Sequence, residues 1–504
     1  MEESSSYKNI FKTTFLFSFV KVFNILTRVA VNKAVAILLG AEGLGIISLY
    51  NNAINVLKSG CGLGIKQSAV RDISEANKEG KIEKISEIIT VTDRVILFTG
   101  LLGLIITLLG APFLSKYSFG NKDYIIPFVV LSAAVAFDIY AEGQMAILTG
   151  MRRLKDLAKV NVIGSIIGMV ASIPLYYFFG KDGIVPSLII SALCLFITTK
   201  FYVYKIETKK VNQELRFVFL KAMPMVKMGG VLMIAGFAGL AFDLFVSVFI
   251  RYEGGLENVG YFQAGATIIT SYFGIVLTAM TTDYYPRICG VNKDNKVLKD
   301  ELNKQVAAGV ILLFPLAVCF VYLAPFFITF LYSNEFAVST QYTDFAILGT
   351  IIIVASNCMG MIFMAKMASK LYLVLVFVVY LCLLCVYVPL YHFCGLRGLG
   401  ISYIMNGVTS LVLFGVVLYK KYNIYINRGN IVLILTVMMT IILTLFARNI
   451  PNLLISIMIG SVIFVISTVY SFSYLKKNMS IDISAYVKNR IKQKNENSRN
   501  NHHL

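Results

Sequence analysis

Apolar runs of about twenty residues, separated by short polar and basic connections, recur along almost the whole chain. A run of this length lets an α-helix cross the hydrocarbon core of a bilayer. The pattern predicts about fourteen such helices, over residues 14–39, 44–68, 87–111, 124–149, 158–179, 183–204, 223–249, 258–285, 306–331, 342–365, 371–393, 397–419, 429–447 and 453–474. With 57% hydrophobic and 14% charged residues among 504, we expect an all-α polytopic membrane protein.

The connections between these helices alternate between rich and poor in lysine and arginine. If the N-terminus is cytoplasmic, the opposite side holds only Lys116, Lys122, Lys181, Arg251, Arg397 and Arg448 outside the spans. Every cytoplasmic connection is then more basic than its outer neighbours, as the positive-inside rule requires. We therefore expect both termini in the cytoplasm. The net charge of +19 follows from these loops, so it does not indicate nucleic-acid binding.

Sequence signals recur at an offset of about 215 residues. "GLGIISLY" opens one helix at Gly43 and "NVGYFQAG" opens another at Asn258, while Ala111-Pro112-Phe113 is followed by Ala324-Pro325-Phe326. Transporters are often built from such internal repeats. The repeat predicts an N-terminal lobe of helices 1–6 over residues 1–210 and a C-terminal lobe of helices 7–12 over 211–425. Two extra helices over 426–475 and a basic cytoplasmic tail over 476–504 complete the expected organisation.

The first predicted helix carries charges that a lipid-facing helix would not tolerate. A charge at the bilayer centre costs roughly 2.5–3.5 kcal/mol on insertion scales. Lys21, Asn24 and Arg28 nevertheless share one stripe of this helix at about 100° per residue. A water-filled cavity between the lobes, receiving an anionic substrate, would explain them. The second helix adds Asn51, Asn55 and Lys58 on one face, and the remaining candidate substrate-binding residues are Arg94, Lys227 and Gln263.

Acidic residues inside the predicted helices are fewer. Asp138 and Glu142 lie one turn apart on the fourth helix, and Asp243 lies on the seventh. These carboxylates are candidates for coupling transport to H+ or Na+. Simpler interpretations stay open. Lys21 and Arg28 could pair with these acids, the asparagines could hydrogen-bond between helices, and Lys58, Arg94 and Lys227 could extend toward the membrane surface.

No sequence feature indicates a resident cofactor or metal. The eight cysteines are scattered, and Cys382 and Cys385 form a CxxC spacing without the second ligand pair that a zinc site needs. "GAEGLG" lacks the preceding strand and the following Lys-Ser/Thr of a phosphate loop, so we do not expect ATP as the energy source. No cleavage site follows the first apolar run, which is expected to remain as an anchor.

Three stretches resemble the Wzx-type polysaccharide flippases of the multidrug/oligosaccharidyl-lipid/polysaccharide exporter superfamily. They are "LLGAEGLGIISLYNNAINVLKSGCGLGIKQSAVRDIS" from Leu38, "VGYFQAGATIITSYFGIVLTAMTTDYYPRI" from Val259 and "LYSNEF" from Leu331. The resemblance covers roughly residues 10–420 and favours the O-antigen and common-antigen lipid flippases. The two helices after residue 425 depart from the many relatives that end after twelve, and resemble the extra pair of the lipid II flippases.

The resemblance implies a flippase, not an enzyme, in the bacterial inner membrane. Its substrate would be an undecaprenyl-pyrophosphate-linked oligosaccharide, moved from the cytoplasmic to the periplasmic leaflet by alternating access. Positions matching the family's cationic wall are Lys21, Arg28 and Lys58, with Arg94 and Lys227 placed less securely. Expected partners are membrane lipids and the polysaccharide polymerase and ligase.

Three rival functions can be weighed on the same residues. A cation-coupled drug antiporter of the same superfamily is the main alternative, but it would favour an acidic cavity. A polymerase or glycosyltransferase would need a larger outer loop or a catalytic acid cluster than the chain offers. A purely structural membrane protein would leave the repeat and the intramembrane charges unexplained.

Overall fold

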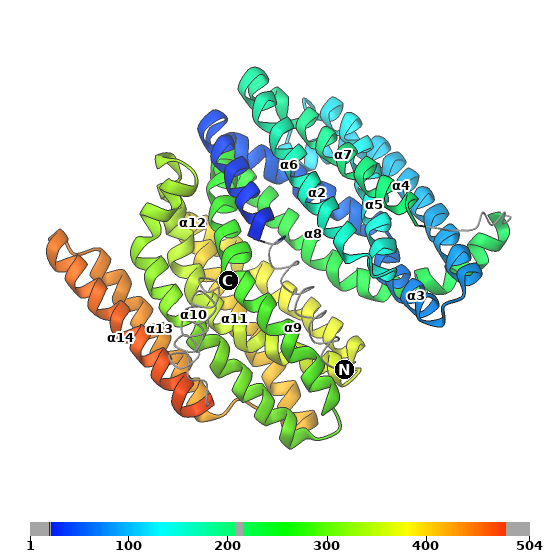
Figure 1. Ribbon diagram of the computed structural model, residues 1–504. Helices are drawn as coiled ribbons and strands as arrows, with labels where there is room; N and C mark the ends of the chain where they lie inside the picture. The colour runs from blue at the N-terminus through cyan, green and yellow to red at the C-terminus, as the bar shows by residue number, and fades with distance from the viewer. Residues whose placement is uncertain (1–19, 21, 207–214, 480–504) are drawn as a thin grey trace, which may run out of the picture. The chain divides into compact units, whose positions relative to one another are not determined.

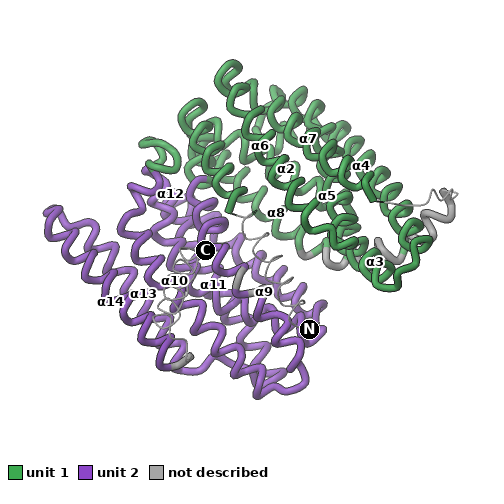
Figure 2. The backbone as a smooth tube through the Cα atoms, viewed as in Figure 1, with its two compact units in different colours: residues 1–263, 329–336 green, residues 264–328, 337–504 purple. Residues whose placement is uncertain are grey.

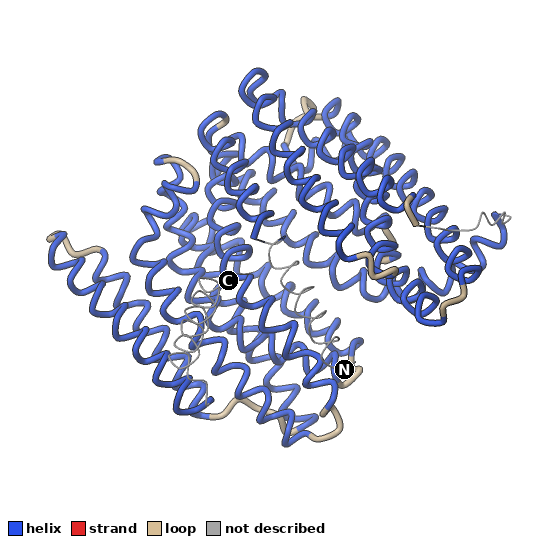
Figure 3. Tube along the Cα trace, in the orientation of Figure 1, coloured by secondary structure: helices blue, strands red, loops and turns tan. Residues whose placement is uncertain are grey.

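The computed structural model describes residues 20, 22–206 and 215–479, and these residues form helices joined by short turns. Within the described part of the chain there is no β-strand (Figure 3). The predicted all-α polytopic membrane fold is therefore confirmed. Residues 22–38 form the first helical stretch. It is followed by α2 (Gly40–Cys61), α3 (Ile65–Glu79), α4 (Ile82–Phe119), α5 (Ile125–Gly150), α6 (Leu154–Phe179) and α7 (Ile184–Tyr204) (Figure 1).

The second half of the chain is built in the same way. It contains α8 (Leu215–Thr267), α9 (Gly274–Gly290), α10 (Asn295–Leu331), α11 (Thr340–Ala365), α12 (Ser369–Tyr422), α13 (Arg428–Arg448) and α14 (Leu453–Met479). Three short segments interrupt these elements. They are the 3₁₀ turns η1 (Gly180–Gly183) and η3 (Asn334–Ser339), and the π-helical turn η2 (Ile268–Phe273).

Nine helical runs among the described residues are long and apolar enough to cross a membrane. Three of them, 154–204, 236–278 and 369–422, have 51, 43 and 54 residues. At 1.5 Å per residue each is far longer than the roughly 30 Å hydrocarbon core, so none can be a single span. Each is broken near its middle, at Gly180, Gly255 or Gly395, where φ is positive. Each run therefore supplies two spans.

Several predicted boundaries are wrong. Helix α4 runs from Ile82 to Phe119 where 87–111 was predicted, and α10 begins at Asn295 where 306 was predicted. The sequence predicts a single helix over 44–68, but α2 ends at Cys61 and α3 begins at Ile65. Leu63 and Gly64 both adopt left-handed backbone, with φ of 48° and 65°. Such angles cannot continue a right-handed helix, so the chain turns here.

The backbone shows the internal repeat directly. Left-handed residues occur in three pairs whose members differ by 215 in residue number. Gly40 (φ 67°) pairs with Gly255 (79°), Arg152 (54°) with Met367 (57°), and Gly180 (55°) with Gly395 (56°). Positive φ is uncommon, especially at non-glycine residues. Its recurrence at one constant offset means that the same tight connections are used twice.

Two repeat-related helices also cross each other reciprocally. At Gly45 of α2 an added Cβ would overlap the carbonyl oxygen of Leu256 in α8, and at Gly260 of α8 it would overlap the carbonyl oxygen of Ala41. Both glycines and both carbonyls are related by the 215-residue offset. A contact in which each copy uses the same surface is the mark of a local two-fold axis.

A hydrogen bond marks where this axis passes. Ser48 Oγ donates to Gln263 Oε1 at 2.8 Å, and these two positions are again 215 residues apart. Equivalent residues can touch each other only close to a two-fold axis. The crossing of α2 and α8 is therefore a pseudo-symmetric contact, and glycine is required where the two backbones approach.

The chain divides into two compact units. Unit 1 comprises residues 1–263 and 329–336, and unit 2 comprises 264–328 and 337–504 (Figure 2). Within unit 1, α4, α5 and α7 pack closely, and a buried cluster that includes Ile73, Ile96 and Ile147 joins α3 to them. The division of the chain into lobes of six helices remains a prediction.

Within unit 2 the last helices are fixed to α10 and α11 by polar contacts. Arg448 forms a bidentate pair with Asp344, at 2.9 and 2.5 Å, and also donates to the carbonyl of Val321 at 2.8 Å. At the other end of α13, the Asn303 side chain accepts from the Asn427 amide at 2.7 Å and from Asn430 Nδ2 at 3.0 Å. Helix α13 is thus held near both of its ends.

The reciprocal crossing predicts a specific intolerance of side chains. We expect Gly45→Ala and Gly260→Ala each to lower the free energy of unfolding by about 1–3 kcal/mol, because the new methyl group overlaps a backbone carbonyl. Thermal unfolding of the purified protein in detergent measures this effect. The matched control is Gly274→Ala, whose Cβ meets nothing within 4 Å. Equal stability of Gly45→Ala and Gly274→Ala would contradict the crossing.

Candidate functional site

Two lysines flank the turn between α2 and α3. Lys58 lies in the last turn of α2, and Lys66 is the second residue of α3. The Gly62 N–H closes α2 on the Lys58 carbonyl at 2.9 Å, and the left-handed residues that follow reverse the chain. The turn brings two lysines that are eight residues apart to one side of the same connection.

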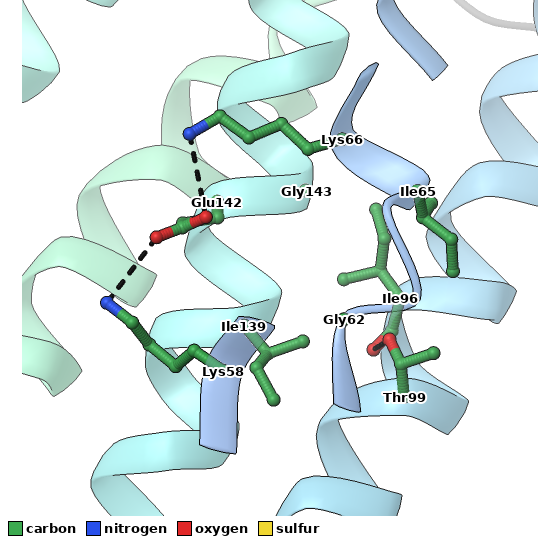
Figure 4. A pocket seen from close by; sticks show the side chains of 9 residues that line it. All are labelled: Lys58, Gly62, Ile65, Lys66, Ile96, Thr99, Ile139, Glu142 and Gly143. Carbon is green, nitrogen blue, oxygen red and sulfur yellow. Dashed lines mark hydrogen bonds and ion pairs between the residues drawn. The ribbon is translucent and has the colours of Figure 1, made fainter. Parts of the chain in front are cut away.

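Two carboxylates on α5 face these lysines. Asp138 and Glu142 are one turn apart and so share a face of the helix. Lys58 Nζ lies 3.3 Å from Asp138 Oδ2 and 3.4 Å from Glu142 Oε1, and Lys66 Nζ lies 3.5 Å from Glu142 Oε2. Figure 4 shows Glu142 between the two lysines. We call Lys58, Lys66, Asp138 and Glu142 the lysine–carboxylate cluster.

The cluster opens onto a cavity of about 370 Å³ within unit 1. The α2–α3 connection forms one wall, with Asn55 and Gln67 beside the lysines, and Met233, Gly236 and Leu240 of α8 also line it. A second, smaller cavity lies on the other side of Lys58 and Glu142, against Ile96 and Thr99 of α4 (Figure 4). Polar groups therefore converge on a hollow of the size that holds small ligands.

The lysine–carboxylate cluster carries two positive and two negative charges and is neutral as a whole. Lys58 and Asp138 are largely buried, with side chains 19% and 23% exposed, whereas Lys66 is 52% exposed. Removal of one partner leaves an uncompensated charge in a poorly hydrated place, which costs free energy. An anion that enters the cavity can take the place of the carboxylates as partner of the lysines.

The structure brings together residues that the sequence assigned to different roles. Lys58 was expected to bind substrate, and Asp138 and Glu142 to couple an ion, yet the three form one network. Asn55 lines the same cavity. Pairing of these acids with Lys21 or Arg28 was left open as an alternative. In the described chain, the lysines that reach Asp138 and Glu142 are Lys58 and Lys66.

The other predicted site residues are dispersed. Asn24 accepts a hydrogen bond from Ser165 Oγ at 2.7 Å, and Gln263 accepts one from Ser48. Arg94 is half-buried in α4 and does not line this cavity. Arg28, Asn51 and Asp243 are exposed. Lys21 lies outside the described residues. The backbone of Lys227 is in α8, and its side chain lies outside the described part of the structure.

Sequence reasoning missed Lys66 and a second polar group on α5. From the sequence alone Lys66 was grouped with the lysines of the basic connections, because hydrophobic periodicity does not indicate the left-handed turn at Leu63. The glycines at 60, 62 and 64 were the available signal, since closely spaced glycines often mark a break in a helix. On the other side of α5, Tyr140 and Gln144 bond to Asp93 of α4.

The fold is shared with solved structures of polytopic membrane proteins. The structure is similar to that of the "Lipid II flippase MurJ, inward closed conformation", with a TM-score of 0.69, 14% identity, and coverage of 93% of this chain and 100% of that one. It is also similar to an inward-facing multidrug resistance MATE family transporter of the MOP superfamily, with a TM-score of 0.61, 16% identity, and coverage of 83% and 96%.

The sequence comparisons identify the family. A family model described as "Polysaccharide biosynthesis protein" matches residues 34–341, which is more than half of the chain. The chain belongs to this family, and the predicted resemblance to polysaccharide flippases is confirmed. The chain is also 22% identical over 358 residues to the lipid III flippase of Escherichia coli (strain K12), covering 68% of this chain and 82% of the relative. The Shigella flexneri protein of the same name matches to the same extent.

The lysine–carboxylate cluster predicts energetic coupling between Lys58 and Asp138. We expect Lys58→Gln alone and Asp138→Asn alone each to lower the melting temperature, because each leaves a half-buried charge without its partner. The loss of unfolding free energy in the double variant should be smaller than the sum of the two single losses by about 0.5–3 kcal/mol. Thermal unfolding in detergent measures all three, and Lys122→Gln, at an exposed position, is the control. Strict additivity would show that the two side chains do not interact.

Proposed function

We propose that the protein is a flippase for a lipid-linked oligosaccharide. The cargo is an oligosaccharide on undecaprenyl pyrophosphate, such as an O-antigen unit, which moves from the cytoplasmic to the periplasmic leaflet of a bacterial inner membrane. Family membership, the lipid III flippase relatives and the flippase-like fold support this proposal. The observation that carries it is the 370 Å³ cavity lined by Lys58 and Lys66.

The chemistry of the cargo explains why lysines line the cavity. A pyrophosphate in the hydrocarbon core would have no counter-ions or water, so its passage needs fixed positive charges. Lysine ammonium groups bind phosphate as point charges, and their flexible stems let them follow a moving head group. The polyprenyl tail is apolar and stays in the bilayer while the head group occupies the cavity.

The paired carboxylates give the site a resting state. Without cargo, Asp138 and Glu142 neutralise the lysines, so the empty cavity holds no uncompensated charge. When the pyrophosphate arrives, it displaces the carboxylates from the lysines. The freed carboxylates can then take up H+ or Na+, and the ion pairs form again after release. This exchange would couple an ion gradient to transport.

The remaining predicted residues belong to the proposed path of the cargo. Lys21, Asn24 and Arg28 on the first helix, with Arg94 and Lys227, would extend the cationic wall beyond the lysine–carboxylate cluster. Asn51, Asn55 and Gln263 are the candidates for bonding to sugar hydroxyls. Asp243 stays a candidate for ion coupling. The protein would alternate between two lobes, and both of its termini would be cytoplasmic. It would work alongside a polysaccharide polymerase and a ligase.

Complementation in the host tests this function. The gene is deleted and restored as wild type, as Lys58→Arg, or as Lys58→Gln combined with Asp138→Asn. The double variant keeps the cluster neutral, so a failure cannot be assigned to a stranded charge. Surface glycan and the cytoplasm-facing pool of lipid-linked oligosaccharide are measured at equal protein levels. We expect Lys58→Arg to restore glycan, and the double variant to reduce it at least tenfold while the lipid pool accumulates.

The contrary result is equally distinct. If deletion leaves the glycan and the lipid pool unchanged but alters sensitivity to drugs or cations, the flippase proposal is wrong. A cation-coupled antiporter of the same superfamily then becomes the leading function. Lys122→Gln serves as the control for a lysine removed from an exposed position.

A further inference from the structure

A second polar group lies inside unit 1, between α4 and α5. Tyr140 Oη donates to Asp93 Oδ1 at 2.7 Å, and Gln144 Nε2 donates to the same oxygen at 2.5 Å. Asp93 lies about 16 Å along α4 from its first residue. Its neighbours Val91, Val95 and Ile96 and the ring of Tyr140 belong to a buried apolar cluster. Asp93 itself is half-buried beside this apolar cluster.

Asp93 differs from the other paired acids of the spanning helices. Asp138, Glu142 and Asp344 each lie within 3.5 Å of a lysine or arginine nitrogen. In the described part of the chain no such ion pair is formed by Asp93, which receives two neutral donors. The negative charge of Asp93 is therefore not balanced by a lysine or arginine side chain in the described structure.

Gln144 supplies an independent indication that a ligand belongs here. Its side chain is 2% exposed, and its Oε1 is buried without a hydrogen-bond partner. A buried acceptor left unpaired costs about 1–3 kcal/mol. The orphaned oxygen is bonded to the same carbon as the nitrogen that contacts Asp93, so a half-turn of the amide directs it at the carboxylate.

We propose that Asp93, Tyr140 and Gln144 form a binding site for a monovalent metal cation such as Na+. Carboxylate, phenol and amide oxygens are hard ligands of the kind that hard cations prefer. Two oxygens facing each other repel, so the empty site turns the amide nitrogen toward Asp93. A cation between them reverses that preference: Gln144 Oε1 gains the cation as its partner, and Gln144 Nε2 gives up its hydrogen bond to Asp93. One carboxylate balances one positive charge.

The position of the site couples cation binding to the lysine–carboxylate cluster through helix α5. Tyr140 and Gln144 lie about 200° around α5 from Asp138 and Glu142. One face of α5 thus holds the proposed cation site, and the opposite face holds the partners of Lys58 and Lys66. Cation occupancy would tighten α5 against α4 and bias the helix that carries the cluster. The site itself does not depend on the identity of the cargo.

Ion-dependent stability of the purified full-length protein tests the site. Melting temperatures are measured in NaCl, KCl and choline chloride at equal ionic strength, and ²²Na+ binding is measured on the same samples. A cation that binds only the folded protein stabilises it by mass action, so we expect Na+ to raise the melting temperature by about 2 °C or more over choline. One Na+ should bind per chain.

The variants separate this site from any other. Asp93→Asn and Gln144→Leu should each lower Na+ affinity at least tenfold, and Tyr140→Phe, which keeps the ring, should lower it less. Asp182→Asn is the matched control, because Asp182 is an exposed carboxylate in the turn η1 and has no part in the proposed ion or cargo path.

Three outcomes would overturn the proposal. They are no difference between Na+ and choline in the wild type, unchanged binding in Asp93→Asn, and an equal loss of binding in Asp182→Asn. An Asp93→Asn effect on proton uptake alone, without metal binding, would also reject the metal site.

Discussion

An ionised side chain inside a bundle of apolar helices needs a partner of opposite charge, and this constraint governs the polar interior of the protein. Lys58 and Lys66 are held by Asp138 and Glu142, and Arg448 is held by Asp344. The buried pair at Arg448 is bidentate and fixes α13 to its unit. The pairs at Lys58 and Lys66 face a cavity, where an anion can replace the carboxylates. The same interaction therefore serves structure in one unit and is available for ligand exchange in the other.

The second determinant is the repeat, and its physical expression is backbone geometry. Left-handed residues at Gly40, Gly180 and Arg152 each have a counterpart 215 residues later. Glycine at 45 and 260 lets α2 and α8 cross in a reciprocal contact, and Ser48 meets its own counterpart Gln263 there. The part of α8 that lines the cavity of the cluster, at Met233, Gly236 and Leu240, lies before the break at Gly255, and the crossing lies after it.

Much of this organisation could be predicted from the sequence. Long apolar runs gave the helices, because length and hydrophobicity alone decide which segments can span a bilayer. The 215-residue offset was visible in motifs such as "GLGIISLY".

The ends of α2 could not be predicted, because the left-handed turn at Leu63 and Gly64 has no counterpart in hydrophobic periodicity. A continuous helix over 44–68 did not indicate that Lys66 and Lys58 contact the same carboxylate. Pairing partners depend on which helices are neighbours, so Asp138 and Glu142 could be identified as important but not matched to their lysines. The Asp93–Gln144 contact was hidden for the same reason.

Transport of the cargo by purified protein tests the central claim most directly. The wild type and the Lys58→Gln/Asp138→Asn variant are reconstituted at equal density into vesicles that contain a fluorescent undecaprenyl-pyrophosphate oligosaccharide. Transfer between leaflets is followed by the loss of accessibility to an external quencher. The account predicts rapid transfer with the wild type, and transfer with the variant no faster than in protein-free vesicles. Equal rates for the wild type and the variant would show that the lysine–carboxylate cluster does not carry the head group. Equal rates for the wild type and protein-free vesicles would show that the protein does not move this lipid.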